Sequence, residues 1–487
     1  MKRLKEFIIL SCCILLLGSC SDFLNTNPST DVADTEVFKT VAGAQAALNG
    51  CYYDMRAYSA GGAGRNDDYG YPSIQMISDV SAEDMIVWGG WFLYTYNYWG
   101  ETRTDIFRSS QLWTFHYRLI NNLNSIIAYV DNSQGDDSEK KYIKGQALAM
   151  RGWAYFDLAR LFQQTYIIAK TMPGVPIYTE PTTDKTPGKP RGTLEDTYKQ
   201  ILSDLTEAEP LLQRYNRGTR TNTIDQNVAW GILSEVYQVM NNWSKSEEYA
   251  KKVLANYQLT TAEQYKAGFN DYKTPSWMWG IQQTEELNMG DYSPFAFWAN
   301  DTRKCYTFRC WFLATNFVNL FDKGDIRYSQ FQYWWNQIYA SFKFRDNDKC
   351  RGSILFMRSD EMLLNAAEAL ARQGKEGDAK DMLWKLQDLR NTPRTQTTGN
   401  ALIEDILIER RKELYGEGFG LFDMLRNQKP LLRQGNHAKY GGAKSFPAHS
   451  WRLIYQLPRA EMLNNTSLKD AIWPEGDQNP YDGVYNP

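Results

Sequence analysis

Apolar residues recur at helical spacing through most of the chain. Near the N-terminus, Val41, Ala44 and Leu48 fall on one stripe, as expected for a helix with one buried face. The residues Thr193-Leu-Glu-Asp196 form a capping-box pattern, in which an acidic side chain satisfies free amides in the first helical turn. The periodicity predicts helices at residues 35–56, 112–130, 142–162, 193–212, 225–240, 244–256, 358–372, 377–391 and 402–415. We therefore expect an all-α fold.

Two pairs of these helices carry small residues at the same offset. Ser234 and Ser246 are twelve residues apart in the first pair, and so are Ala367 and Ala379 in the second. Small residues at this offset let antiparallel helices approach closely, and tetratricopeptide repeats use the same spacing. We therefore expect a tetratricopeptide-like helical-repeat scaffold. Two unrelated helical hairpins remain the alternative, and the two pairs are too far apart in the sequence to be expected as adjacent repeats.

Three long stretches between the helices lack this periodicity, namely residues 59–103, 172–191 and 257–356. Pro, Gly and Asn interrupt them, and they hold many of the 16 Trp and 31 Tyr residues that bring the aromatic content to 14%. Irregular loops of this length are uncommon in compact domains unless they are functional. The predicted architecture is a helical scaffold with long, aromatic-rich irregular loops on one face.

The first twenty residues have the pattern of a secretory signal. Basic residues precede an apolar run at residues 7–17, and Leu17-Gly-Ser-Cys20 ends the segment. A cysteine directly after small residues makes this a lipobox, in which the chain is cleaved before Cys20 and the thiol is acylated. The run of eleven residues is shorter than the roughly 20 that a membrane-spanning helix needs. The alternative is an ordinary cleaved signal in which Cys20 is incidental.

These features divide the chain into three parts. Residues 1–19 are expected to be a signal peptide, and the polar residues 20–34 a flexible tether between the lipid and the folded body. Residues 35–487 are expected to fold as a single domain, with ligand-binding loops in the first and third of the irregular stretches.

Charge and residue usage exclude several classes of function. The net charge of −3 becomes −5 without residues 1–19, which carry three basic residues and one acidic residue. A nucleic-acid-binding protein needs a basic face, so no nucleic-acid partner is expected. The three histidines, His116, His437 and His449, are too scattered for a zinc site, and we expect no metal or cofactor. No order of Ser, His and Asp points to a hydrolase.

Cysteine usage adds little. After Cys20 the chain has only Cys51, Cys305, Cys310 and Cys350, which is no disulfide framework for a chain of this size. We expect Cys305 and Cys310 to be independent buried thiols, with a bridge between them as the alternative.

Several motifs occur in a fixed order between Cys20 and Asn465. They are Cys20-Ser-Asp-Phe-Leu-Asn-Thr-Asn-Pro28, Arg151-Gly-Trp-Ala-Tyr-Phe-Asp-Leu-Ala-Arg-Leu-Phe162, Ala229 to Leu254, Arg358-Ser-Asp-Glu-Met-Leu-Leu-Asn-Ala-Ala-Glu-Ala-Leu370, Glu409-Arg-Arg-Lys-Glu-Leu414, Phe422-Asp-Met-Leu-Arg426 and Leu457-Pro-Arg-Ala-Glu461. This ordered set resembles the SusD/RagB family of nutrient-binding outer-membrane lipoproteins of Bacteroidetes. Gly420 and Leu421 stand where the family usually has a basic and an aromatic residue, and Thr466 replaces a proline.

The resemblance implies a function as well as a fold. Members of the SusD/RagB family have a tetratricopeptide-like body that lies as a lid over a TonB-dependent transporter of the SusC/RagA type. A lipid anchors them in the outer membrane, where they are expected to face the cell surface. They hold a glycan or a peptide there and pass it to the transporter without catalysis. In the family the ligand-binding loop follows the first helix, where residues 59–103 lie in this chain.

An aromatic segment lies within that stretch. Seven of the twelve residues from Trp88 to Trp99 are aromatic. Flat rings can bury the apolar C–H faces of sugars, while polar side chains bond to the hydroxyls. Alternate rings, at Trp88, Phe92 and Tyr96, would instead pack the loop onto the helices, and the flanking glycines favour exposure of the others. The predicted ligand-binding residues here are Asp79, Trp88, Trp91, Tyr94, Tyr98 and Trp99. Asp79 and Asp84 are candidate hydroxyl acceptors, with helix capping as the alternative for each.

A second aromatic region contains Trp277, Trp279, Phe295, Trp298, Trp311, Tyr333, Trp334 and Trp335. We expect most of these rings in the core. Trp334 and Trp335 cannot both face inward from a strand, because successive side chains point to opposite faces. The prediction therefore adds Trp298, Arg303, Trp334 and Trp335 to the ligand site.

Three functions remain open at this point. The leading one is a surface glycan-binding lipoprotein that serves an outer-membrane transporter. The same scaffold can also present a groove for peptides or another nutrient. The third is a glycoside hydrolase with a carboxylate pair, for which Asp79 and Glu83 are the nearest candidates.

Overall fold

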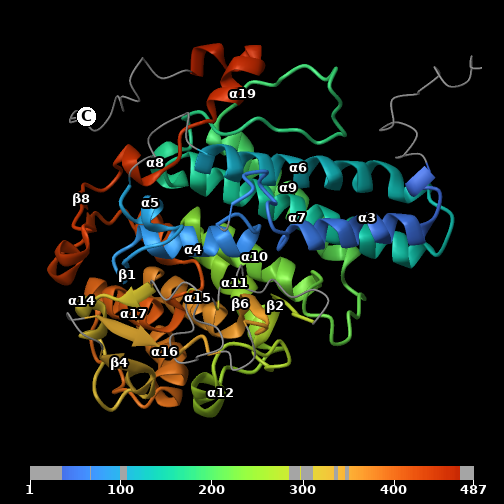
Figure 1. Ribbon diagram of the computed structural model, residues 1–487. Helices are drawn as coiled ribbons and strands as arrows, with labels where there is room; N and C mark the ends of the chain where they lie inside the picture. Colours follow the sequence, from blue (N-terminus) through green and yellow to red (C-terminus); the bar gives the residue numbers. More distant parts are fainter. Residues whose placement is uncertain are drawn as a thin grey trace, which may run out of the picture.

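The computed structural model describes residues 36–65, 67–98, 107–284, 295, 297, 311–333, 338–345 and 350–471, and most of them are helical (Figure 1). The helices are α3 (Val41–Asp54), α4 (Tyr71–Ser81), α5 (Leu93–Tyr96), α6 (Phe107–Tyr129), α7 (Asp137–Phe162), α8 (Tyr166–Ala169), α9 (Leu194–Leu211), α10 (Gln226–Val239), α11 (Trp243–Leu254), α12 (Ala262–Ala267), α14 (Thr315–Val318), α15 (Ser359–Arg372), α16 (Glu376–Leu389), α17 (Gly399–Leu414), α18 (Gly420–Arg426) and α19 (Arg459–Asn464). The strands are β1 (Met85–Val87), β2 (Trp277–Ile281), β3 (Trp311–Leu313), β4 (Phe331–Tyr333), β5 (Tyr339–Ser341), β6 (Ile354–Arg358), β7 (Leu431–Leu432) and β8 (Ser445–Phe446). The predicted mainly helical class is confirmed, and the long irregular stretches contain short strands that the pattern did not predict.

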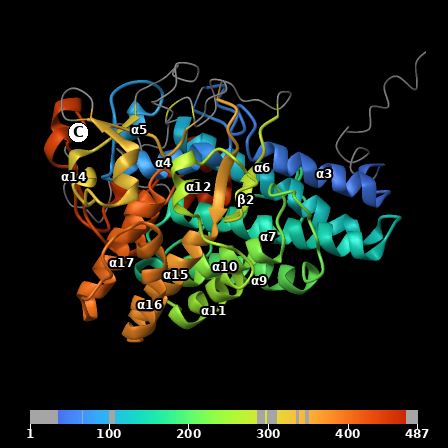
Figure 2. The same ribbon diagram turned by 90° about the horizontal axis from the view of Figure 1, so that it is seen from below.

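The long helices pack one against the next. α6 packs on α7, α7 on α9, α9 on α10 and α10 on α11, and α11 then packs on α15, which contacts both α16 and α17. Seen from below, α3 and α6 lie at one end of this row and α16 and α17 at the other (Figure 2). Such a row is typical of helical-repeat scaffolds.

The small residues predicted to mark a repeat lie where paired helices cross. The hydroxyls of Ser234 in α10 and Ser246 in α11 each donate to the backbone carbonyl of the other, at 3.1 and 3.0 Å. Ala367 in α15 and Ala379 in α16 are fully buried. The expectation that the two pairs are not adjacent is wrong, because α11 packs directly on α15. The chain leaves the row after α11, forms β2 to β6 and returns beside the helix it left.

Close packing of α7 on α9 depends on a glycine and a buried ion pair. A Cβ atom at Gly152 would lie 3.0 Å from Cγ of Leu205 and 3.3 Å from the carbonyl oxygen of Ile201. The neighbouring Arg151 donates from Nε and Nη2 to the carboxylate of Asp204 at 2.9 and 2.6 Å. Both charged side chains are buried, so the pair fixes how the two helices meet.

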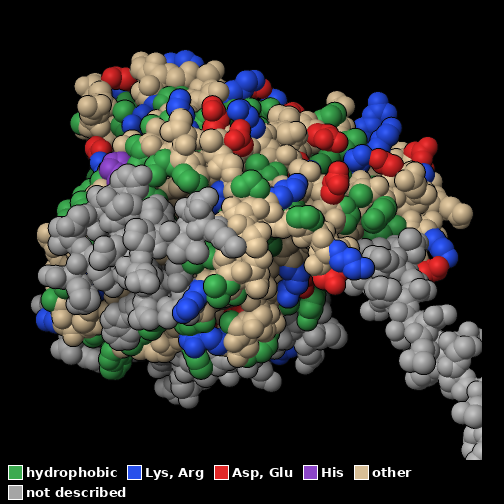
Figure 3. Space-filling view, turned by 90° about the horizontal axis from the view of Figure 1, so that it is seen from above, with side chains coloured by type: hydrophobic (Ala, Val, Ile, Leu, Met, Phe, Trp, Pro, Cys, Tyr) green, Lys and Arg blue, Asp and Glu red, His purple; other side chains and the backbone are tan. Residues whose placement is uncertain are grey.

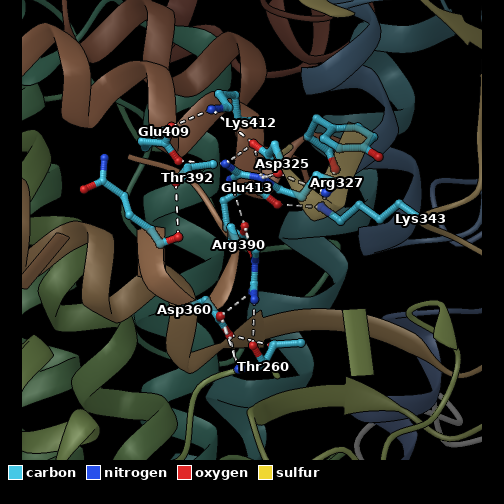
Figure 4. A network of polar contacts seen from close by, with 12 residues as sticks. Thr260, Asp325, Arg327, Lys343, Asp360, Arg390, Thr392, Glu409, Lys412 and Glu413 are labelled. Carbon is cyan, nitrogen blue, oxygen red and sulfur yellow. Dashed lines mark hydrogen bonds and ion pairs between the residues drawn. The ribbon is translucent and has the colours of Figure 1, made fainter. Parts of the chain in front are cut away.

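A buried ionic network lies beneath α17 (Figure 4). Its five basic and five acidic residues are Arg327, Lys343, Arg358, Arg390, Lys412, Asp325, Asp360, Glu409, Glu413 and Glu417. Glu413 accepts hydrogen bonds from Arg327, Arg358 and Arg390 at 2.8–3.1 Å. Burial alone would raise the pKa of Glu413, but these arginines hold it well below its ordinary value.

A four-stranded antiparallel sheet joins segments that are far apart in the sequence. Its strand order is β1-β3-β5-β4, and it lies near α14 and α17 at the lower left of Figure 1. Val87 of β1 pairs with Trp311 of β3, and Leu313 of β3 pairs with Tyr339 of β5. The first and third irregular stretches therefore form one sheet.

Over the part of the chain described, no helix combines the length and hydropathy that a membrane crossing requires. On the face seen from above, acidic and basic side chains are interspersed rather than gathered by sign (Figure 3). Cys51 is a buried free thiol, whereas Cys350 is disulfide-bonded.

Candidate ligand-binding site

The two aromatic regions predicted from the sequence meet at the β1 end of the sheet. Because Val87 lies opposite Trp311, the loop after β1 begins at the same end of the sheet at which β3 begins. Phe92 of the first region lies edge-on to Phe297 and Trp311 of the second, with ring centroids 5.3 and 5.1 Å apart. All three rings are fully buried. This ring cluster, Phe92, Phe297 and Trp311, gives the loop a rigid base.

Trp88 stands at the end of β1 with about half of its side chain in solvent. It is 51% exposed, and its ring centroid lies 6.4 Å from that of the buried Phe312. Gly90, with φ of +83°, then turns the chain back toward the core. A large flat ring that is supported at one edge and open to solvent is the arrangement predicted for a sugar platform.

Trp91 and Tyr94 are partly buried and already have aromatic or cationic neighbours. The guanidinium of Arg65 lies 5.2 Å from the centre of the Trp91 ring and 3.8 Å from that of Phe107. The ring of Tyr94 is 6.2 Å from the same Phe107. Arg65 thus connects the loop after β1 to the start of α6, and these rings are only partly available to a ligand.

Tyr98 is held from two sides. Its ring lies edge-on to Phe446 at 5.1 Å, and its hydroxyl donates to the carbonyl of Ser81. Its φ of +53° is in the left-handed region, which non-glycine residues rarely adopt. The side chain therefore fixes the end of the described part of the loop.

The alternation expected along this loop is followed only in part. Phe92 and Tyr96 are buried as that pattern requires, but Trp88 is the most exposed of the described rings in this loop. Trp88 directly follows β1 and precedes the turn at Gly90, whereas Phe92 and Tyr96 lie just before and within the short helix α5, so no single period runs through the three positions.

Arg433, which follows β7, holds the loop to α4. It donates from Nε to the carbonyl of Ala82 at 2.7 Å, from Nη2 to that of Val80 at 2.5 Å and from Nη1 to that of Tyr96. The side chain is buried, and its guanidinium lies 4.5 Å from the centre of the Tyr96 ring. Sequence reasoning missed this residue, because an isolated arginine in a polar loop carries no local signal of a contact more than 300 positions away.

His437 in the 3₁₀ segment η5 (Gly435–Tyr440) supports the same loop. Its Nδ1 lies 2.8 Å from the Tyr96 hydroxyl, and its Nε2 lies 2.9 Å from the carbonyl oxygen of Glu83. Burial lowers the pKa of His437 to about 4, so the ring is neutral at pH 7. Because a carbonyl can only accept, Nε2 carries the proton and Nδ1 accepts from the tyrosine. The sequence pattern indicated no role for His437, because the three histidines are too scattered for a metal site.

Asp79 and Asp84 both have protein partners. The buried carboxylate of Asp79 accepts from the backbone N–H of Gly418 at 2.8 Å and of Gly420 at 3.0 Å. Burial raises the pKa of Asp79 to about 7, although the two amide donors act to lower it. Asp84 forms an ion pair with Arg411. These bonds favour the backbone-capping alternative for Asp79 over direct contact with a ligand hydroxyl.

Gly420, where the resemblance anticipated a basic residue, is explained by the same contact. A Cβ atom there would lie 2.7 Å from Cβ of Ala82 and 3.1 Å from Oδ1 of Asp79. The turn before α18 can therefore approach the end of α4 only with glycine at this position.

The second aromatic region is mostly core. Trp277, Trp279, Phe295 and Trp311 are buried, in agreement with the prediction for this set. Tyr333 at the end of β4 is 59% exposed and lies edge-on to Tyr339 at 5.4 Å. The remaining predicted residues lie outside the described part of the chain, and their roles stay predictions: Cys20, Trp99, Trp298, Arg303, Trp334 and Trp335.

A helical-repeat scaffold that presents an anchored aromatic loop has the architecture of a ligand-binding protein. A family model described as "Starch-binding associating with outer membrane" matches residues 22–238, and a second, described as "SusD family", matches residues 322–474. The chain belongs to the SusD/RagB family.

Similar proteins span nearly the same length. SusD-like protein P38 of Formosa agariphila is 22% identical, over 89% of this chain and 94% of that protein. A SusD-like carbohydrate binding protein from Bacteroides vulgatus has a solved structure with a TM-score of 0.81 and 28% identity, covering 88% of this chain and 98% of that one. A SusD superfamily protein from Bacteroides thetaiotaomicron gives a TM-score of 0.76 and 26% identity, with the same coverage. The whole scaffold, and not one motif, is thus shared with these proteins.

Proposed function

We propose that the protein binds a glycan with the loop after β1 and delivers it to a TonB-dependent transporter of the SusC/RagA type. The observation that carries the proposal is Trp88, which is half exposed and whose ring lies 6.4 Å from that of the buried Phe312. The apolar face of a sugar can stack on the open indole, which removes apolar area from water. If the geometry resembles aromatic pairing, stacking adds about 0.5–1.5 kcal/mol beyond that burial.

The way the loop is held supports this proposal. Arg433 and His437 attach α5 to the C-terminal part of the chain. Phe92, which directly precedes α5, packs against Phe297 in the buried ring cluster. A ligand that meets a preorganised ring pays less conformational entropy on binding than one that must order a free loop. Trp88 can therefore act as a fixed platform.

Family membership supports the ligand class and the location. One matching model is described as starch-binding and associated with the outer membrane, and the related Bacteroides vulgatus protein is named a carbohydrate binding protein. In this proposal an acylated Cys20 anchors the chain in the outer membrane, and the folded body faces the cell surface. The protein captures and transfers its ligand and performs no catalysis.

Calorimetry with a glycan panel tests the ligand and the loop together. The Trp88→Ala variant should bind the selected glycan roughly tenfold more weakly, which corresponds to about 1.4 kcal/mol. Tyr129→Ala is a matched control, because Tyr129 is 40% exposed at the other end of α6 from the loop. With a rise of 1.5 Å per residue along α6, it lies about 33 Å from Phe107, which touches the loop. Both variants should keep the wild-type melting temperature within a few degrees.

Other results would point elsewhere. Equal glycan affinity in Trp88→Ala and wild type would remove the loop from the site. Binding of a tryptic peptide panel without glycan binding would select the peptide alternative, and release of shorter sugars would indicate a hydrolase. Cys20→Ala should move the protein from the membrane fraction to the soluble fraction; retention in the membrane would contradict the lipid anchor.

A further inference from the structure

A cavity separate from the aromatic loop opens beside α17. Its volume is about 280 Å³, and its walls come from α17, α18, residues 415–420 and 427–432, and the turn between α4 and β1. Most of its lining is apolar and includes Leu407, Ile408, Leu414, Phe419, Met424 and Leu432. An apolar cavity of about 150 Å³ is large enough to bind benzene. This one therefore has room for one ring or branched chain together with a head group.

The polar groups in the depth of the cavity already have partners. Asp79 accepts from two backbone amides, and the oxygens of Asp423 accept from Nε of Arg410 at 2.6 Å and Nε of Arg426 at 2.7 Å. A sugar ring placed here would bury several hydroxyls against these occupied groups and apolar carbons, which is costly. The interior therefore selects an apolar group rather than a saccharide.

The mouth of the cavity carries more negative than positive charge. Three carboxylates line it there, Glu83, Asp84 and Glu404, together with two cations, Arg411 and Lys429. Arg411 is shared between Asp84 and Glu83, and it lies 3.5 Å from the latter. Burial raises the pKa of Glu83, while the Leu432 amide and the charges of Arg411 and Arg433 act to lower it.

One of the two cations at the mouth is easily displaced. Lys429 pairs with Glu404 at 2.6 Å, but about half of each side chain is in solvent. An exposed pair of this kind contributes about 0–1 kcal/mol. A ligand cation can therefore replace Lys429 beside Glu404, or share Glu83 with Arg411. A ligand anion would be repelled by the three carboxylates there.

We propose that this cavity is a second ligand site, which takes a small organic amine whose apolar part is no larger than one ring or branched chain. The apolar part fills the space along Leu407 and Phe419, and the ammonium group lies at the mouth between Glu83 and Glu404. This site is independent of the glycan loop, from which β1 separates it, and it does not rest on the function proposed for that loop.

Titration calorimetry of the full folded chain with phenethylamine tests the proposal, with phenylacetate as the matched anion. We expect saturable binding of the amine with a stoichiometry near one, and binding of the anion at least tenfold weaker. Glu83→Gln keeps the oxygen that accepts from the Leu432 amide at 2.7 Å and removes the charge, so it should weaken amine binding several-fold. Ile408→Trp should abolish binding by filling the cavity from the half-exposed face of α17.

Glu83→Gln changes the charge of the site and Ile408→Trp changes its volume. If one variant folds poorly, amine binding by the other still tests the proposal. Glycan affinity should be unchanged in Ile408→Trp, which separates this site from the aromatic loop. Absence of saturable amine binding, equal binding of phenylacetate, or unchanged amine affinity in the folded variants would overturn the proposal. None of these results would affect the glycan-binding proposal.

Discussion

The substitution Glu413→Gln tests whether the ionic network beneath α17 stabilises the fold. The change keeps the shape of the side chain but removes one of five buried negative charges that face five positive charges. Only one of the two oxygens that accept from Arg327, Arg358 and Arg390 remains, and the amide NH₂ of the new side chain faces a guanidinium. The network is left with one uncompensated positive charge in a site closed to water.

The size of the effect follows from this geometry. Removal of one partner from a buried ion pair costs about 3–5 kcal/mol, because the remaining charge stays desolvated. A natural domain has only about 5–15 kcal/mol of stability in total. With an m-value near 3 kcal/mol per molar urea, the midpoint of unfolding should fall by roughly 1–1.7 M.

Urea unfolding followed by tryptophan fluorescence measures this directly. Glu404→Gln is the control, because Glu404 forms an exposed pair with Lys429 that contributes about 0–1 kcal/mol. If Glu413→Gln lowers the midpoint no more than Glu404→Gln does, the network is not a stabilising element and the reasoning fails.

The same variant makes a prediction about pH. The pKa of Glu413 in the folded chain lies well below its ordinary value of 4.5, so below pH 4.5 the unfolded state takes up a proton that the folded state does not. The stability that Glu413 supplies is therefore complete above pH 4.5 and declines as the pH falls further. The difference in midpoint between wild type and Glu413→Gln should be constant from pH 6 to 8 and should narrow below pH 4.5.

Three further substitutions test the surroundings of the loop. Arg433→Met should weaken glycan binding several-fold in calorimetry, because three backbone carbonyls lose their donor. Arg433→Lys should recover part of the affinity. Equal affinity in wild type and both variants would contradict the anchoring role of Arg433. Burial raises the pKa of Asp79 from 3.8 to about 7, so its contribution to the free energy of unfolding should decrease as the pH rises from 4 to 7, and this decrease should be missing in urea titrations of Asp79→Asn. Gly420→Ala should cost about 1–3 kcal/mol in the same assay through overpacking, whereas Gly377→Ala, where a new Cβ has no neighbour within 4 Å, should not destabilise.

The scaffold was predictable because its helices are amphipathic. The predicted helix at residues 193–212 corresponds to α9, and its capping box between Thr193 and Asp196 is present. By contrast, α4 lies within a stretch predicted to be irregular. Every one of its residues from Pro72 to Ser81 is buried, including the polar Gln75, Ser78 and Asp79, so its polar residues do not mark a side that faces solvent.

The proposed ligand site could be predicted from the sequence only at the level of a loop, and its role in binding stays a prediction. The density of aromatic residues pointed to the loop after β1 as a ligand-binding loop, but it could not distinguish Trp88, which is exposed, from Phe92, which is buried. That difference depends on α5 and on the pairing of Val87 with Trp311, and both are set by contacts that are distant in the sequence. The residues that hold the loop, Arg433 and His437, have no local pattern at all.

Five consecutive charged residues of α17, Glu409 to Glu413, explain how the scaffold and the loop are connected. Successive residues of a helix point about 100° apart, so five in a row cover every side of α17. Glu413 faces the ionic network, Arg410 bonds to Asp423 at the start of α18, and Arg411 bonds to Asp84 at the start of β1. A helix with charges on all sides is stable in the interior only where each side meets a partner of opposite sign. The same helix turn that closes the core of the scaffold therefore also holds, through Arg411 and Asp84, the start of the strand that Trp88 follows.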